Sequence, residues 1–162
     1  MDIRPISDRY AVSPQIDPQD AAAIKAAGIT TVVCNRPDAE VPPSHQSDAM
    51  RVAIEAAGLK FEVLPITHQT MTPDRVAQQA ALVDASDGPV LAYCASGTRC
   101  SILWALSQAG QKSADEILGA AYQATEQVYA DESAKNPAFK KIYTEWEKYR
   151  KTQNAWFSVA EM

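Results

Sequence analysis

Four short, largely apolar runs alternate along the chain with segments of helical character, and this alternation constrains the fold more than any other feature. The runs read YAVSPQI, ITTVVCN, LKFEVLPI and PVLAYC. The segments between them open at a proline or a capping residue and close at a glycine, as in DPQDAAAIKAAG, which is typical of helices. Because ITTVVCN and PVLAYC are apolar almost throughout, we expect strands that are buried on both faces. The alternation predicts an α/β fold with a mainly parallel central sheet of four to five strands flanked by helices.

Three further helical segments follow the fourth run and complete the predicted organisation. They read TRCSILWALSQAG, KSADEILGAAYQATEQVY and NPAFKKIYTEWEKYRKTQ. Aromatic and aliphatic residues recur at three- and four-residue spacings in the last segment, which predicts an amphipathic C-terminal helix at about residues 137–152. The chain has 162 residues, with no internal repeat and no linker-like stretch. We therefore expect a single domain over residues 1–162.

The charge and the cysteines of the chain argue against several classes of protein. A formal net charge of −5 and a pI of about 5.0 disfavour nucleic acid and anionic membranes as partners. No run approaches the roughly 18 apolar residues that a membrane helix needs, and MDIRPISDRY lacks the apolar core of a secretory signal. The three cysteines are odd in number and lack a C-x-x-C spacing, which indicates free thiols in a reducing compartment. We expect a cytoplasmic protein without a metal or a cofactor.

The segment VLAYCASGTRCSILW holds the candidate site. An apolar strand ends at Cys94, a short loop containing Gly97 turns the chain, and a helix begins near Arg99. Backbone N–H groups in a loop at a helix N-terminus can converge on an anion, and the same field lowers the pKa of a thiol held there. Arg99 adds a fixed positive charge and a two-pronged donor for an oxyanion. The arrangement predicts a nucleophilic thiolate within an anion-binding loop.

The segment LAYCASGTRCSILWAL resembles the active-site segment in the phosphatase-like domain family of beta-lactamase hydrolase-like proteins. That family is related to dual-specificity and tyrosine phosphatases. AVSPQI, GITTVVCNRPDAE and GLKFEVLPI extend the resemblance over nearly the whole chain up to the last helix. The resemblance implies a tyrosine-phosphatase-like fold in which Cys94 is the nucleophile and Arg99 binds the oxyanion. The anion-binding loop that it implies consists of the residues between these two, Ala95, Ser96, Gly97 and Thr98.

Two departures from the phosphatase pattern leave the chemistry open. Tyrosine phosphatases place five residues between cysteine and arginine, whereas this chain has four. They also carry a histidine before the cysteine, where this chain has Tyr93. Sulfurtransferases of the rhodanese type use a six-residue loop that begins at the cysteine, as here, and members of the resembling family have been described both as phosphatases and as sulfurtransferases.

The general acid is a further open point. Related phosphatases carry an aspartate after the third strand, which protonates the leaving oxygen. The corresponding loop here, PITHQTM, contains no carboxylate. His68 in that loop is one candidate, and Asp38 and Glu40 of the NRPDAE segment are two others. An ion pair between Arg36 and Glu40 that shapes the loop is the interpretation we prefer for Glu40.

Three functions remain compatible with these residues. The first is a phosphatase-like hydrolase that acts through a phosphocysteine on Cys94, and it leads by a small margin. The second is a rhodanese-like sulfurtransferase that carries a persulfide on Cys94. The third is a non-catalytic anion-binding domain, against which the thiol argues because a binder has no need of one. The expected partner is a small anionic substrate, either a phosphate ester or a sulfane-sulfur donor.

Cys34 is a candidate redox partner for Cys94. It ends the second predicted strand, and parallel strands bring their carboxyl ends to the same edge of a sheet. Some phosphatases that resemble this chain use a cysteine at that strand end to form a protective disulfide with the nucleophile. Cys100 is the rival, although a side chain directed toward the core would keep it apart from Cys94.

Overall fold

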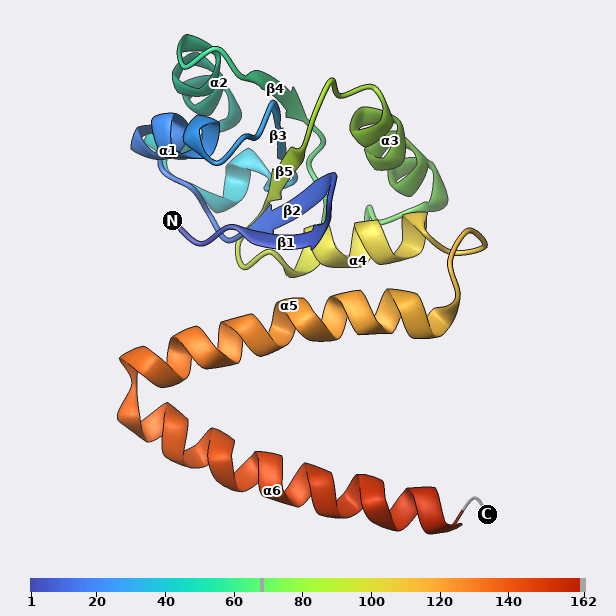
Figure 1. Cartoon of the computed structure of the whole chain (residues 1–162). Coiled ribbons are helices and arrows are strands. Elements are labelled where there is room, and N and C mark those ends of the chain that lie inside the picture. Colours follow the sequence, from blue (N-terminus) through green and yellow to red (C-terminus); the bar gives the residue numbers. More distant parts are fainter. Residues whose placement is uncertain (68, 161–162) are drawn as a thin grey trace. The chain divides into compact units, whose positions relative to one another are not determined.

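The computed structural model describes residues 1–67 and 69–160, without the side chains of 121–128, 131–132 and 153–160. Its first 121 residues are built around a five-stranded sheet. The strand order is β1-β2-β5-β3-β4 (Figure 1). The pairs β2–β5, β5–β3 and β3–β4 are parallel, and β1 pairs antiparallel with β2. The strands are β1 (Arg4–Ser7), β2 (Tyr10–Ser13), β3 (Thr31–Cys34), β4 (Lys60–Val63) and β5 (Val90–Tyr93). The prediction of a mainly parallel α/β sheet is confirmed.

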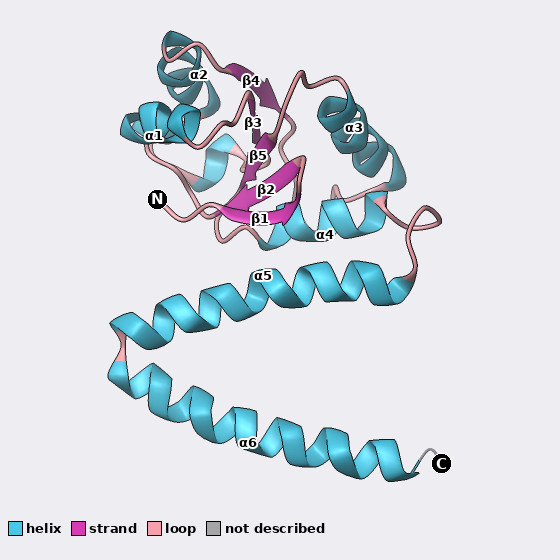
Figure 2. Ribbon diagram, in the orientation of Figure 1, coloured by secondary structure: helices cyan, strands magenta, loops and turns pink. Residues whose placement is uncertain are grey.

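Helices flank both faces of this sheet (Figure 2). Strand β5 lies between β2 and β3, and all four of its residues are buried, which explains why its sequence is apolar throughout. The helices α1 (Ala21–Ala26) and α2 (Ser47–Ala56) cover one face, while α3 (Pro73–Asp84) and α4 (Thr98–Ser107) cover the other. The face toward α1 and α2 holds an apolar cluster that includes Ile24, Met50 and Ile54.

Strand β1 is the one element of the sheet that the apolar pattern did not predict. It forms a hairpin with β2 in which Ser7 pairs with Tyr10, so only Asp8 and Arg9 lie in the turn. This pair of residues is not a common signal for a two-residue hairpin turn, which favours glycine or asparagine. The strand also lies at the edge of the sheet, and only Ile6 of its residues is buried.

The last two helices are α5 (Ala114–Lys135) and α6 (Pro137–Ala160). The chain divides by internal packing into two compact units, residues 1–121 and 122–162. In the second unit, aromatic rings of α5 and α6 pack together. The ring centroids of Tyr129 in α5 and Tyr143 in α6 are 4.7 Å apart, and those of Tyr143 and Trp146 are 5.6 Å apart. The helix predicted at about 137–152 lies within α6, which continues to Ala160. No helix within the described residues is long and apolar enough to span a membrane.

Candidate active site

Cys94 follows directly after the central strand β5, and α4 begins four residues later at Thr98. Gly97 makes this sharp turn with a φ of 88°, in the left-handed region that favours glycine. A Cβ at this position would lie 3.5 Å from the backbone of Ser13 on the neighbouring strand. The loop therefore needs glycine for its backbone conformation and packs closely against β2.

Hydrogen-bond donors converge on the Cys94 sulfur. The N–H of Gly97 donates to Cys94 Sγ over 3.1 Å. A hydrogen bond from the Cys100 thiol has the largest effect on Cys94 and, with the N–H groups of Ser96, Cys100 and Arg99, lowers the pKa of Cys94 to about 5 despite its burial. Cys94 is therefore a thiolate at neutral pH, held in a ring of donors.

The sequence named Cys100 only as a rival redox partner, and its role as a hydrogen-bond donor to Cys94 was not predicted. Cys100 lies in the first turn of α4, is fully buried, and its thiol has the largest effect on the pKa of Cys94. Burial and the neighbouring Cys94 raise the pKa of Cys100 well above that of a free thiol, so Cys100 stays protonated and can donate. The sequence did offer one indication of this role. Cys100 follows Arg99 directly, so both residues lie in the first turn of the same helix.

Arg99 is held in place by Glu40. Its two terminal nitrogens donate to the two carboxylate oxygens of Glu40 over 2.8 and 2.6 Å, and Nη1 also donates to the carbonyl of Ile66 over 2.7 Å. This paired contact lowers the pKa of Glu40, so the carboxylate is ionised near neutral pH. Arg36 Nε also lies 3.5 Å from Glu40 Oε2, which confirms the predicted ion pair between these two residues. The two arginines and Glu40 form a charged cluster beside the cysteine loop.

A cavity of about 530 Å³ opens on the outer side of the loop. It is lined by residues of the loop and by three residues from elsewhere in the chain: Glu40, Thr67, Gln69, Ala95, Ser96, Thr98 and Arg99. The cavity thus combines Arg99 and the hydroxyls of Ser96 and Thr98, which suit a small anion, with the carboxylate of Glu40 that is paired to Arg99. We refer to it below as the anion pocket.

The three candidates for a general acid are in different situations. Glu40 lines the anion pocket but is ionised by its contact with Arg99. Asp38 accepts hydrogen bonds from the N–H and the hydroxyl of Ser47 over 2.7 and 2.8 Å, at the start of α2. The carboxylate of Asp38 therefore caps the start of α2. His68 lies outside the described residues.

Cys34 lies in the apolar cluster that faces α1 and α2, and Cys94 is not a member of that cluster. The Cys34 thiol donates to the carbonyl of Arg36 over 3.4 Å. Burial raises the pKa of Cys34. All three cysteines are free, and the disulfide between Cys34 and Cys94 stays a prediction. Among the described residues, no group of three or more metal-binding side chains comes together.

Two contacts support the loop from outside. Arg4 of β1 donates to the carbonyl of Ser96 over 3.2 Å. The Tyr10 hydroxyl donates to the carbonyl of Cys100 over 3.1 Å and accepts a hydrogen bond from Gln79 over 3.0 Å. Both contacts come from the β1–β2 hairpin and join residues about 90 positions apart, so no local pattern in the sequence indicates them.

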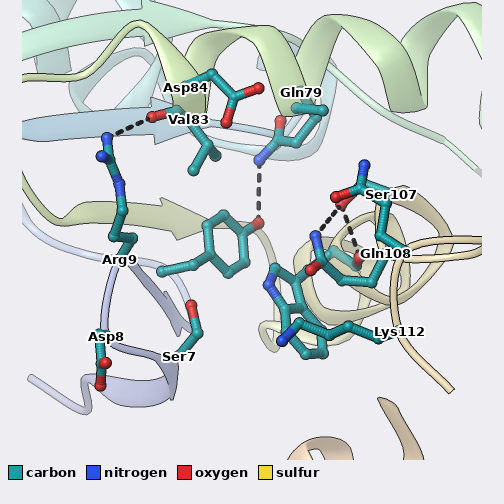
Figure 3. Close-up of a pocket in the computed structure, with 13 residues that line it drawn as sticks. Ser7, Asp8, Arg9, Gln79, Val83, Asp84, Ser107, Gln108 and Lys112 are labelled. Atoms are coloured by element: carbon teal, nitrogen blue, oxygen red, sulfur yellow. Dashed lines mark hydrogen bonds between the residues drawn. The ribbon is translucent and has the colours of Figure 1, made fainter. Parts of the chain in front are cut away.

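A second cavity, of about 320 Å³, lies beside Tyr10 and Gln79 between the β1–β2 turn, α3 and α4 (Figure 3). Tyr10 pairs with Val90 at the first residue of β5, whereas Cys94 follows the last residue of that strand. The lining of this cavity carries both signs of charge, with Asp8, Arg9, Asp84 and Lys112 among its residues. The loop residues do not take part in it.

Comparison with protein families gives a match to the phosphatase-like domain of beta-lactamase hydrolase-like protein over residues 2–111. A beta-lactamase hydrolase-like protein of Xylella fastidiosa is 31% identical over 119 residues, which are 72% of this chain and 28% of that protein. One from Agrobacterium fabrum is 28% identical over 104 residues, or 64% of this chain and 24% of its own length. The chain thus spans about a quarter of these relatives.

Solved structures share the fold. A candidate phosphatase from Neisseria meningitidis Z2491 is 36% identical, with a TM-score of 0.69 over 77% of this chain and 89% of its own. TpbA of P. aeruginosa, solved in complex with phosphotyrosine, is 19% identical, with a TM-score of 0.52 over 65% of this chain and 61% of its own. At that identity the second likeness concerns the fold alone.

Proposed function

Because the chain belongs to the phosphatase-like domain family of beta-lactamase hydrolase-like proteins, we propose that it is a cysteine-dependent hydrolase of phosphate esters. The family match confirms the resemblance predicted from the cysteine loop. The observation that carries the proposal is the N–H of Gly97 donating to Cys94 Sγ over 3.1 Å, within a loop that lowers the pKa of this thiol to about 5.

In the proposed reaction, the Cys94 thiolate attacks the phosphorus of an ester bound in the anion pocket. The bond between phosphorus and the ester oxygen breaks as the bond between phosphorus and sulfur forms. Arg99 and the loop N–H groups stabilise the charge on the phosphoryl oxygens. Water then hydrolyses the phosphocysteine, releasing inorganic phosphate and restoring the thiolate.

Glu40 acts in this proposal as a positioning residue rather than as the general acid. An ionised carboxylate has no proton to donate, and both of its oxygens are bonded to Arg99. A leaving oxygen of low basicity, such as that of a phenol with a pKa of about 10, needs less protonation than an alkoxide. Aryl phosphates are therefore the substrates we expect to react fastest.

Sulfur transfer is the second candidate, and the six-residue loop from Cys94 to Arg99 favours it. In that reaction the thiolate takes the outer sulfur of a sulfane donor as a persulfide, releases the remainder as an anion, and passes the sulfur to a thiophilic acceptor. An anion-binding domain without turnover is the third candidate, and the low pKa of Cys94 argues against it.

A direct comparison of substrates tests the proposal. The protein is incubated with an aryl phosphate and, separately, with thiosulfate and cyanide, and phosphate and thiocyanate are measured. We expect phosphate release that Cys94→Ser abolishes and that Cys34→Ser, a matched change at a buried cysteine, retains. Thiocyanate formation without phosphate release would replace the proposal by the sulfurtransferase, and full activity of Cys94→Ser would remove the loop from the chemistry.

A further inference from the structure

An apolar groove lies between α3, α4 and the loop that leads into α3. Its volume is about 540 Å³. Its described lining residues are all uncharged: Met71, Thr72, Pro73, Val76, Ala77, Ala80, Leu106, Ser107 and Gln111. Leu106 is 48% exposed although it is a large apolar residue. The groove therefore presents apolar surface to solvent in a form that could enclose a ligand.

One face of α4 connects this groove to the anion pocket. Thr98, Ile102 and Leu106 are spaced by four residues and so lie on the same side of the helix. Thr98 lines the anion pocket and Leu106 lines the groove. Ile102, between them, is 39% exposed. Ile102 and Leu106 thus give this face of α4 partly exposed apolar surface between Thr98 at the anion pocket and the groove.

The segment after β4 borders both cavities in the same order. Thr67 and Gln69 line the anion pocket, and Met71 and Pro73 line the groove. The carbonyl of Ile66 accepts a hydrogen bond from Arg99, which fixes the start of this segment beside the first turn of α4. Arg99 and Leu106 are seven residues apart, which corresponds to about 10 Å along a helix. The two cavities are therefore neighbours that one elongated molecule could occupy together.

We propose that the groove binds an uncharged apolar tail of the substrate whose phosphoryl group lies in the anion pocket. The substrate class is then an amphiphilic phosphate monoester, with a charged end at Cys94 and an apolar end between α3 and α4. This inference rests on the proposed function for the charged end of the molecule. The mixed charges in the cavity of Figure 3 make that cavity a poor receptor for such a tail.

The test uses a series of 4-alkylphenyl phosphates with tails from methyl to octyl, at concentrations below those at which the esters aggregate. The alkyl group changes the apolar length with little effect on the reactivity of the phenol, so kcat/KM reports binding of the tail. Burial of each methylene is expected to raise kcat/KM about two- to fourfold until the groove is filled. Inorganic phosphate release is measured for the wild-type protein.

Two groove variants and one control locate the tail. Leu106→Gln and Val76→Gln place a polar group on opposite walls of the groove, and each should remove most of the dependence on tail length. Val52→Gln changes an apolar residue of α2 that is 71% exposed and lies outside both cavities, so it should keep the full dependence.

The outcomes separate the inference from the proposed function. Turnover with no dependence on tail length overturns the inference and leaves the proposed function standing. A dependence that both groove variants retain places the tail elsewhere on the protein and also overturns the inference. If no ester is hydrolysed, the proposed function fails, and the affinity of Cys94→Ser for the same esters by calorimetry decides whether the groove binds the tail.

Discussion

Removal of the Cys100 thiol should raise the pKa of Cys94 and move the acid limb of the pH–rate profile. The thiol hydrogen bond from Cys100 is the largest cause of the low pKa of Cys94, which is about 5. A hydrogen bond to a charged group contributes about 1.5–3 kcal/mol, and a thiol is a weak donor, so we take the lower end of this range. Since a pKa difference of one corresponds to about 1.36 kcal/mol, Cys100→Ala should raise the pKa of Cys94 to about 6.

The direction of the change in kcat/KM follows from the protonation state of Cys94 that reacts. The thiolate is the nucleophile, so kcat/KM falls as the pH drops through the pKa of Cys94. At pH 5.5, a pKa of 5 leaves about three quarters of Cys94 ionised, and a pKa of 6 leaves about one quarter. Cys100→Ala should therefore lose about threefold in kcat/KM at this pH and almost nothing at pH 8.

Two measurements check this prediction. The pH profile of kcat/KM with an aryl phosphate gives the acid limb, and the ultraviolet absorbance of the thiolate, with Cys94→Ser subtracted, gives the pKa without turnover. Cys100→Ser keeps a donor and should stay near the wild type, as should Cys34→Ala on the other face of the sheet. An unchanged pKa in Cys100→Ala would refute the assignment of the Cys100 thiol as a donor to Cys94.

Three further perturbations test other parts of the site. Glu40→Gln removes the charge that holds Arg99, and we expect kcat/KM for an aryl phosphate to fall about tenfold, equivalent to ~1.4 kcal/mol. Tyr10→Phe leaves the buried side-chain amide of Gln79 without its acceptor, which should lower the free energy of unfolding by about 1–3 kcal/mol in chemical denaturation. Gly97→Ala forces a side chain into a φ of 88°, at a cost of about 1–2 kcal/mol; a wild-type midpoint of denaturation would contradict this interpretation of the loop.

Much of the fold was predictable because its signals are local. The apolar runs that form β2, β3, β4 and β5 were each identified. For β2, β3 and β5 the reason is full burial within the sheet, whereas β4 lies at the edge and buries only Phe61. Prolines and glycines at the ends of the helical segments marked the helices between them. The hairpin strand β1 was missed because it lies at the edge, buries only Ile6 and turns through Asp8 and Arg9.

The candidate site was predictable in part, for the same reason. A cysteine at the end of an apolar run, a glycine three residues later and an arginine at a helix start stand within six residues of one another. Their spacing alone predicts an anion-binding loop, because strand, turn and helix leave little freedom to so short a segment. The contact between Arg99 and Glu40 joins residues 59 positions apart, and nothing in the local pattern indicates it.

The sequence by itself thus determined the type of sheet, the order of strands and helices along the chain, and the loop that carries Cys94 and Arg99. Only the tertiary structure decided which side chains reach that loop: Glu40 on Arg99, Arg4 on the Ser96 carbonyl, and the Cys100 thiol on Cys94. The physical reason is that burial patterns repeat along the chain and can be read from neighbouring residues, whereas these contacts depend on the strand order and on how α4 is rotated against the sheet.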